Sequence, residues 1–193
     1  ARSAASCAAR SRSTIAPGST SATGTSADDV AAERAEKIGI APRLSDLSGK
    51  VVGLYSNKKL NADRVLEMIA QELAPLGEFT IKTGTYHAEK EMSHAEWGDI
   101  DACDVVILAN GDCGACSSSG IVNAIELEKR GIPAMLVTTP PFLDAVRTSA
   151  SLRGMPGISW AVIDHPVASL MEDELRDRAI VAARQAPGVL LGA

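Results

Sequence analysis

The chain has 193 residues, a hydrophobic fraction of 46%, an aromatic fraction of only 3% and a formal net charge of −5. This length accommodates one domain of ordinary size and a tail. The acidic balance, without a basic stripe, argues against a nucleic-acid partner. No apolar run approaches the roughly 18 residues that span a bilayer, so we expect a soluble protein without a membrane partner. With so few aromatic residues, the core must consist of Val, Ile, Leu and Ala, as in buried parallel strands and their covering helices.

The first 27 residues are mostly Ala, Ser, Thr, Gly and Arg, and no acidic residue precedes Asp28. Such a composition is typical of an organelle transit peptide or of a disordered tail. We therefore expect residues 1–44 to be a disordered or transit-like segment, followed by a single α/β domain over residues 45–193. The expected location is the cytoplasm, or an organelle matrix if the segment is a targeting peptide.

From Lys50 onward, short apolar runs alternate with segments of helical periodicity. Ser169 and Glu172 have the spacing of a capping box that would open the last helix. The spacing of apolar residues predicts helices over 62–76, 117–130, 142–152 and 172–185. The apolar or alternating runs predict strands over 51–55, 79–83, 104–109, 134–137 and 160–163.

Five strands that alternate with helices indicate a mostly parallel sheet that is covered on both faces. We predict a three-layer, doubly wound α/β fold of flavodoxin or Rossmann type, with strand order 2-1-3-4-5. Ligands bind such folds beyond the carboxyl ends of the strands. The unusual polar residues of this sequence fall in the loops at those ends, which predicts an active site there. These loops span residues 57–61, 110–119, 138–141 and 164–166.

Cys113 and Cys116 are separated by two residues, in a small-residue turn between a predicted buried strand and a helix N-terminus. A thiol attacks only as the thiolate, which helix N-termini and nearby cations stabilise. This argument alone favours Cys116, because we expect Cys113 in the turn, less stabilised by the helix and closer to a substrate. Asp112 opposes thiolate formation at Cys113 unless it is itself paired, and Lys58 and Lys59 are candidate counter-charges.

The candidate catalytic residues are Cys113, Cys116, His165 and Lys59, with His165 as a proton donor at the end of the fifth predicted strand. No Gly-x-Gly-x-x-Gly pattern follows the first strand, so a dinucleotide has no support. We expect no cofactor and no resident metal. The candidates for substrate binding are polar residues of the same loops: Asn57, Asn61, Asp112, Ser117, Ser118, Thr138 and Thr139.

Three kinds of function are compatible with the cysteine pair. In the first, Cys113 attacks an electrophilic atom of a small molecule, and Cys116 resolves the adduct to a disulfide that an external thiol reduces. In the second, the two cysteines act as acid and base without a redox step, as in two-cysteine racemases and lyases. In the third, the pair binds a metal ion or a partner protein. Tetrahedral zinc needs four ligands, however, and the predicted loops offer Cys113, Cys116 and His165.

The cysteine loop resembles the signature of the UGSC family, which is named for selenocysteine-Gly-Ser-Cys. The resemblance implies that Cys113 occupies the selenocysteine position and contacts the substrate first, with Cys116 as its partner. In two places the sequence departs from the pattern: Ala115 replaces the motif Ser, and Val122-Asn123 replaces an expected His-Asp pair, which argues against a proton relay from that helix. The similarity covers about residues 45–190 and rests on residues 57–63, 111–118, 126–133 and 164–170.

The family motif is similar to the selenocysteine-x-x-Cys of the catalytic subunits of glycine and proline reductases, which implies reductive chemistry on a small molecule. The prediction is therefore a thiol-dependent oxidoreductase or reductive lyase, with a small-molecule substrate and a thiol reductant as partners. Fold similarity alone fixes no reaction, so the other two kinds of function stay open. A homo-oligomer is also compatible with the sequence.

Overall fold

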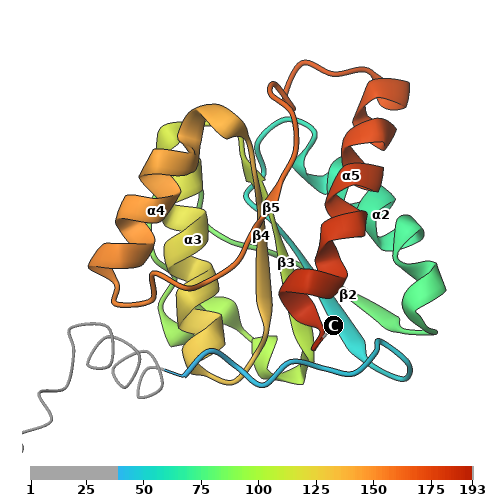
Figure 1. Cartoon of the computed structure of the whole chain (residues 1–193), viewed down its shortest axis with the longest axis vertical. Helices are drawn as coiled ribbons and strands as arrows, with labels where there is room; N and C mark the ends of the chain where they lie inside the picture. Colours follow the sequence, from blue (N-terminus) through green and yellow to red (C-terminus); the bar gives the residue numbers. More distant parts are fainter. Residues whose placement is uncertain (1–38, 193) are drawn as a thin grey trace, which may run out of the picture.

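The computed structural model describes residues 39–192. Its centre is a five-stranded sheet in the order β2-β1-β3-β4-β5, in which every neighbouring pair is parallel (Figure 1). The predicted α/β fold and strand order are therefore confirmed. The strands are β1 (Val51–Ser56), β2 (Thr80–Thr85), β3 (Val105–Gly111), β4 (Ala134–Thr138) and β5 (Ala161–Val162).

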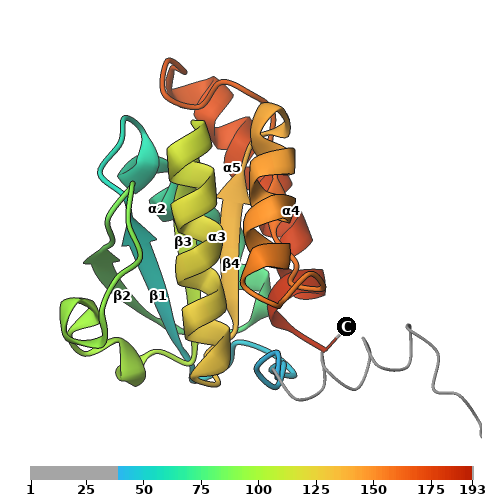
Figure 2. The same cartoon turned by 90° about the vertical axis from the view of Figure 1, so that its left-hand side faces the viewer.

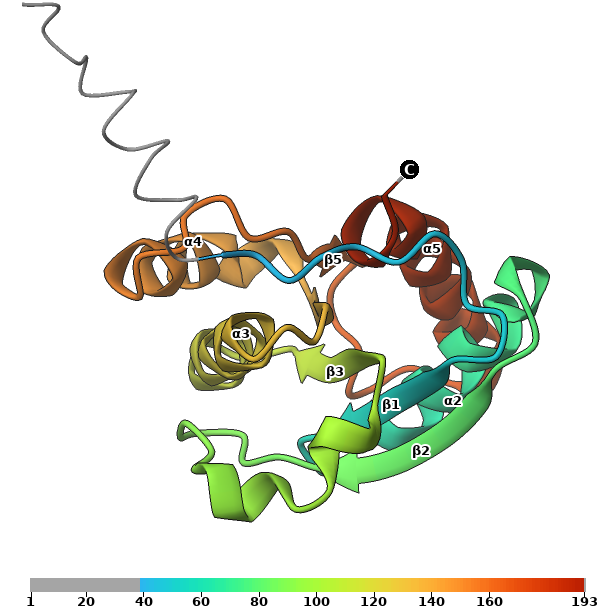
Figure 3. The same ribbon diagram turned by 90° about the horizontal axis from the view of Figure 1, so that it is seen from below.

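Helices cover both faces of the sheet, with α2 and α5 on one side and α3 and α4 on the other (Figure 3). Within the described part of the chain, no helix is long and apolar enough to cross a membrane. The α-helices are α2 (Ala62–Glu72), α3 (Gly114–Lys129), α4 (Leu143–Leu152) and α5 (Glu172–Leu190). Short 3-10 helices are η1 (Ala74–Leu76), η2 (His94–Trp97), η3 (Ile100–Ala102) and η4 (Pro140–Phe142).

The central strand β3 is buried over its whole length. Its side chains alternate between the two cores: Ile107 belongs to the core under α2 and α5, whereas Val106 and Leu108 belong to the core under α3 and α4. A parallel strand covered on both faces needs apolar residues at every position, which is why this run is continuous in the sequence. The strand ends at Asn110 and Gly111, where the polar loop begins.

Helix α5 begins at Glu172, as predicted, but its capping pair differs from the prediction. The backbone N–H of Met171 donates to Glu174 Oε2 at 3.1 Å, so these two residues form the capping pair. The predicted pair of Ser169 and Glu172 is wrong by two residues. The helix also continues to Leu190, beyond the predicted end at residue 185, and it does so with a proline in its last turns.

Residues just upstream of the expected boundary at residue 45 contact the α/β domain. Leu44 forms an isolated parallel bridge with the C-terminal end of the described chain. The backbone N–H of Ala41 and the guanidinium of Arg43 each donate to the Glu128 carboxylate at 2.8 Å. These residues therefore pack on the domain, whereas the transit-like prediction for residues 1–38 lies outside the described residues.

The carboxyl ends of the strands meet at one edge of the sheet. In Figure 2 the arrowheads of β1 and β4 point to the end of the molecule where the loops after β1 and β5 lie. The predicted site loops come from those strand ends. The fold therefore brings the loop after β3, which carries the cysteine pair, to the same edge as these loops.

Candidate active site

Helix α3 starts at the cysteine pair. Cys113 is its N-cap residue, with extended backbone angles (φ −152°, ψ 164°), and Cys113 Sγ accepts the backbone N–H of Cys116 at 3.1 Å. The predicted start at Ser117 is wrong, because the helix already begins at Gly114. This reverses the expected effect of the helix. In the reduced protein, the unpaired N–H groups of the first turn stabilise a thiolate at Cys113 rather than at Cys116.

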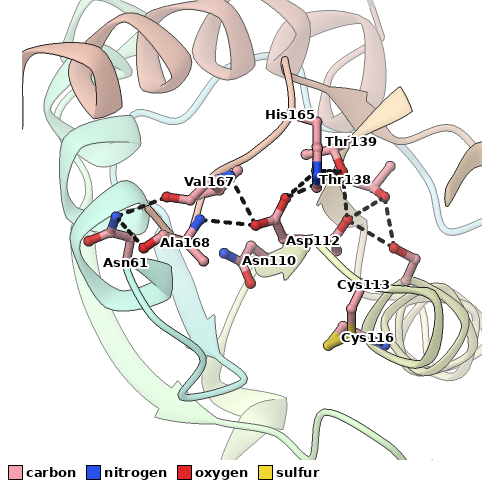
Figure 4. Close-up of polar contacts among 12 residues, drawn as sticks. Asn61, Asn110, Asp112, Cys113, Cys116, Thr138, Thr139, His165, Val167 and Ala168 are labelled. Atoms are coloured by element: carbon pink, nitrogen blue, oxygen red, sulfur yellow. Dashed lines mark hydrogen bonds and ion pairs between the residues drawn. A yellow bond between two sulfur atoms is a disulfide. The ribbon is translucent and has the colours of Figure 1, made fainter. Parts of the chain in front are cut away.

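The two sulfur atoms also differ in exposure. They are joined as a disulfide, with the two Cα atoms 5.2 Å apart (Figure 4). Cys113 is partly exposed, whereas Cys116 is only 2% exposed and lies in the first helical turn. An approaching molecule therefore meets Cys113 first. The third described cysteine, Cys103, is free and buried, and burial raises the pKa of its thiol.

Three hydroxyl groups hold the end of β3 beneath the cysteine loop. The carbonyl of Gly111 accepts hydrogen bonds from Ser117 Oγ (2.9 Å), Thr138 Oγ1 (3.0 Å) and Thr139 Oγ1 (3.3 Å). A Cβ atom at position 111 would lie 2.6 Å from Thr138 Oγ1, so this close approach requires glycine. The side chains of these three hydroxyl residues are buried, and their hydroxyl groups hold the backbone in place below the sulfur atoms.

Asp112 connects the cysteine loop to the loop after β5 (Figure 4). Its Oδ2 atom accepts the backbone N–H groups of Val167 and Ala168, both at 2.9 Å, and its Oδ1 atom lies 2.9 Å from His165 Nδ1. The Asp112 side chain is 9% exposed and that of His165 is 39% exposed. Asp112 is thus paired, as thiolate formation at the adjacent Cys113 requires, because these donors offset its negative charge.

The two asparagines of the loop after β1 bind backbone groups of neighbouring loops. Asn57 is buried; its Nδ2 atom donates to the Asn110 carbonyl at 2.8 Å, and its Oδ1 atom accepts the backbone N–H of Lys59 at 3.1 Å. Asn61 precedes α2 with a left-handed backbone (φ 64°). Its Nδ2 atom donates to three carbonyl groups of the loop after β5, the nearest being that of Val167 at 2.9 Å (Figure 4).

A cavity of about 270 Å³ opens beside the sulfur atoms. It brings together four of the candidate site residues, namely Cys113, Cys116, Asp112 and Lys59, and its wall is completed by Leu60, Asn110 and Ala168. Of the described candidate residues, those outside this wall are Asn57, Asn61, Ser117, Ser118, Thr138, Thr139 and His165.

Lys59 lies between this cavity and a larger one of about 560 Å³. Its side chain is 48% exposed, and its Nζ atom lies 3.5 Å from Glu89 Oε1. Lys58, the other candidate counter-charge, lines only the larger of these two cavities and pairs with Asp63 at 2.8 Å. Ser118 lines a third cavity, of about 250 Å³, on the outer side of α3. Lys59 is therefore the lysine that reaches the cysteine cavity.

Three residues of the cavity wall, Leu60, Asn110 and Ala168, were not among the sequence candidates. Leu60 is a large apolar side chain that is 73% exposed, and Asn110 is a polar side chain that is only 1% exposed. Asn110 Nδ2 donates to the Leu60 carbonyl at 3.4 Å, and Asn110 Oδ1 has no hydrogen-bond partner among residues 39–192. The one signal in the sequence was an amide residue at the end of an otherwise apolar strand.

The described residues do not include any cluster of three or more His, Cys, Asp or Glu side chains placed to hold a metal ion. The two cysteines come closest to a ligand set, and the nearest histidine of their loops, His165, faces Asp112. The geometry of this site therefore suits thiol chemistry better than a tetrahedral metal site, which needs four ligands.

The model of the UGSC family matches residues 24–192. The chain belongs to the UGSC family. The match confirms the resemblance carried by the cysteine loop, and it extends upstream of residue 45, in agreement with the packing of Ala41 and Arg43 on the domain. No curated protein and no solved structure matches the chain. The match establishes the family and identifies no reaction.

Proposed function

We propose that this UGSC-family protein is a thiol-dependent oxidoreductase that acts on a small molecule through Cys113 and Cys116. The proposal rests on the position of Cys113, which caps α3, accepts the N–H of Cys116 and lies at the wall of a cavity. Helix N-termini stabilise thiolates, and a thiolate at a cavity wall is a nucleophile within reach of a ligand. Cys116, which is buried, forms the disulfide with Cys113.

The two thiols can deliver two electrons to a substrate R–L. The Cys113 thiolate attacks R, the S–R bond forms, and L leaves with the electron pair of the broken bond. The Cys116 thiolate then attacks the Cys113 sulfur, so that the disulfide forms and R leaves with the S–R electron pair. The two protons of the thiols end on L and R, and an external dithiol or two monothiols restore the reduced pair. Because the substrate R–L is cleaved into the two products RH and LH, this is also the reaction of a reductive lyase.

The charged residues around the cavity have supporting roles in this scheme. Lys59 supplies a positive charge at the cavity wall that favours an anionic ligand or the thiolate. His165 is hydrogen-bonded to Asp112, and when protonated it offsets the carboxylate charge beside Cys113. In the same position it exchanges protons with water, because its ring is partly exposed. On these grounds, both residues take part in the proposed reaction.

The remaining candidates act mainly as positioning residues in this proposal. Their polar atoms bind the backbone beneath or beside the cysteine loop, so their loss would move the sulfur atoms rather than remove a substrate contact. Asp112 belongs to this group and also lines the cavity. Ser118 is directed to a separate cavity and would contact only a larger ligand. The positioning residues are Asn57, Asn61, Asp112, Ser117, Thr138 and Thr139.

A redox role is favoured over an acid–base role by the origin of the two sulfur atoms. An acid and a base that exchange protons with one carbon atom must approach it from two sides. Here both cysteines come from the first turn of one helix and are bonded to each other. The cytoplasm or an organelle matrix would supply the reducing thiol that the scheme needs.

The proposal is tested by a redox titration in buffers of reduced and oxidised dithiothreitol, followed by alkylation and site-resolved mass spectrometry. We expect Cys113 and Cys116 to titrate together as one reversible two-electron couple, while Cys103 stays a thiol throughout. The Cys103→Ser variant should titrate identically. A pair that never forms the disulfide, or that binds stoichiometric zinc in the freshly purified protein, would contradict the proposal.

A further inference from the structure

The strongest unexplained feature of the cysteine cavity is the side-chain oxygen of Asn110. The residue is 1% exposed, and its Oδ1 atom has no hydrogen-bond partner within the described chain. Buried polar atoms are almost always hydrogen-bonded, because an unpaired one loses its contacts with water without replacement. Most of the other polar groups of this loop have protein partners. Because Asn110 also lines the cysteine cavity, this buried acceptor is placed to receive a donor from a ligand in that cavity.

The orientation of the Asn110 amide is set by its neighbours. Its Nδ2 atom faces the Leu60 carbonyl at 3.4 Å, and exchanging the two ends of the amide would place an oxygen against that oxygen. The Asn110 main chain is also fixed, because its carbonyl accepts Asn57 Nδ2 at 2.8 Å. The amide is therefore held in one orientation, in which Oδ1 rather than Nδ2 is the atom without a partner.

We propose that Asn110 Oδ1 is a ligand-binding acceptor, and that the substrate of this site is a small molecule with an N–H or O–H donor beside the atom that Cys113 attacks. The inference rests on the proposed function for the attack itself. Asn110 and Cys113 line the same cavity, and both are labelled in Figure 4. The cavity volume of about 270 Å³ equals that of about nine water molecules, which leaves room for a small ligand.

The remaining wall restricts the ligand further. Leu60 and Ala168 are apolar, and Lys59 is the cationic residue of this wall. A small amide, amine or hydroxyl compound with an anionic group directed to Lys59 satisfies all three features. A purely hydrocarbon electrophile would leave Asn110 Oδ1 unpaired and would bind less well.

The test uses two electrophiles of nearly equal shape, N-methyl-iodoacetamide and methyl iodoacetate. They differ in one group: the amide N–H of the first is an ester oxygen in the second. Either reagent alkylates the Cys113 thiolate with release of iodide. The Cys116→Ser protein is used so that Cys113 is the reacting thiol of the site, and its alkylation is followed by site-resolved mass spectrometry. Glutathione under the same conditions supplies the intrinsic ratio of the two rates.

We expect the amide-to-ester rate ratio at Cys113 to exceed the glutathione ratio by about tenfold, the factor for about one net hydrogen bond. Asn110→Leu, which keeps the size and removes the acceptor, should bring the ratio back to that of glutathione. The matched control is Asn123→Leu on α3, because Asn123 is equally buried but has protein partners at 2.8 Å and 3.1 Å. This variant should keep the tenfold preference.

The inference is overturned if wild-type Cys113, in the Cys116→Ser background, shows the glutathione ratio, and this result needs no folded Asn110 variant. It is also overturned if Asn110→Leu folds and keeps the preference. The proposed function has a separate readout in the same data, namely the absolute rates. If both reagents react faster with Cys113 than with glutathione, but in the glutathione ratio, the activated thiolate is supported and the proposed role of Asn110 is contradicted.

Discussion

Two buried carboxylates bracket helix α3, and they use nearly the same set of hydrogen bonds. At the start of the helix, Asp112 accepts two backbone N–H groups at 2.9 Å and a nitrogen of His165. Near its end, Glu128 accepts the backbone N–H groups of Ala41 and Ala134, both at 2.8 Å, and the guanidinium of Arg43. Each carboxylate thus fastens a distant segment of the chain to the helix.

The two carboxylates differ in their third hydrogen-bond partner. Arg43 is permanently charged, and the Glu128 side chain is completely buried, so this end is a fixed anchor. His165 is partly exposed and is charged only when it is protonated, and Asp112 lies next to Cys113. In the proposed function, one type of carboxylate clamp thus serves packing at one end of the helix and thiol chemistry at the other.

The largest expected effect on stability is that of Glu128→Ala. The change leaves two buried N–H groups and the mostly buried Arg43 unpaired, so we expect the free energy of unfolding to fall by about 3 kcal/mol. Urea denaturation measures it. The alkylation rate of Cys113 in the reduced, folded protein should stay unchanged. Glu126→Ala on the same helix, which removes a more exposed pair with Lys129, should cost no more than about 0.5 kcal/mol.

Asp112→Asn should have a smaller effect on stability and a clear effect on the thiol. The amide oxygen can still accept both backbone N–H groups at the Oδ2 position, but these hydrogen bonds lose the carboxylate charge and the amide nitrogen takes the place of the acceptor beside His165, so we expect a loss of about 2 kcal/mol. A negative charge beside Cys113 also disappears, so the pH midpoint of Cys113 alkylation should move down by about one unit. Asp144→Asn is the control, because Asp144 is 99% exposed and pairs with Arg147 on its own helix. A midpoint that moves up would show that Asp112 positions the thiol more than it opposes its ionisation.

His165→Gln should have the smallest effect. Its ring is partly exposed, so we expect a stability change of about 0.5 kcal/mol. Gln can still donate to Asp112 but carries no positive charge, and the alkylation midpoint of Cys113 should therefore rise by about half a unit. His94→Gln in the exposed η2 helix is the control. If His165→Gln and His94→Gln give the same midpoint, His165 has no electrostatic role at the thiol.

The sequence predicted the fold well because the strands of a buried parallel sheet are marked by continuous apolar runs, as along β3. It also placed the cysteine pair at a strand-to-helix junction. The start of α3 was missed because Gly114 and Cys116 have low helix propensities. The pairing of Asp112 with His165, and that of Asn61 with the loop after β5, were not predictable, since they depend on how separate loops meet in space.

The hydrogen bonds of the candidate site were also hard to predict from the sequence, because they depend on how separate loops meet in space. Polar residues at the strand ends were predicted to bind the substrate, and the structure shows hydrogen bonds from most of them to backbone groups, such as that of Asn57 to Asn110. Conversely, Asn110 lies within a strand in the structure and was not singled out in the sequence. Which polar atom is left for a ligand is decided by the complete set of hydrogen bonds.

The central claim is that Cys113 attacks first and Cys116 resolves. It is tested most directly by reacting reduced Cys116→Ser and Cys113→Ser proteins with glutathione disulfide and following the mixed disulfide at each site by mass spectrometry. We expect Cys113 in the first variant to form a stable glutathione adduct at least about tenfold faster than Cys116 does in the second. Equal rates, or a faster reaction of Cys116, would contradict the account.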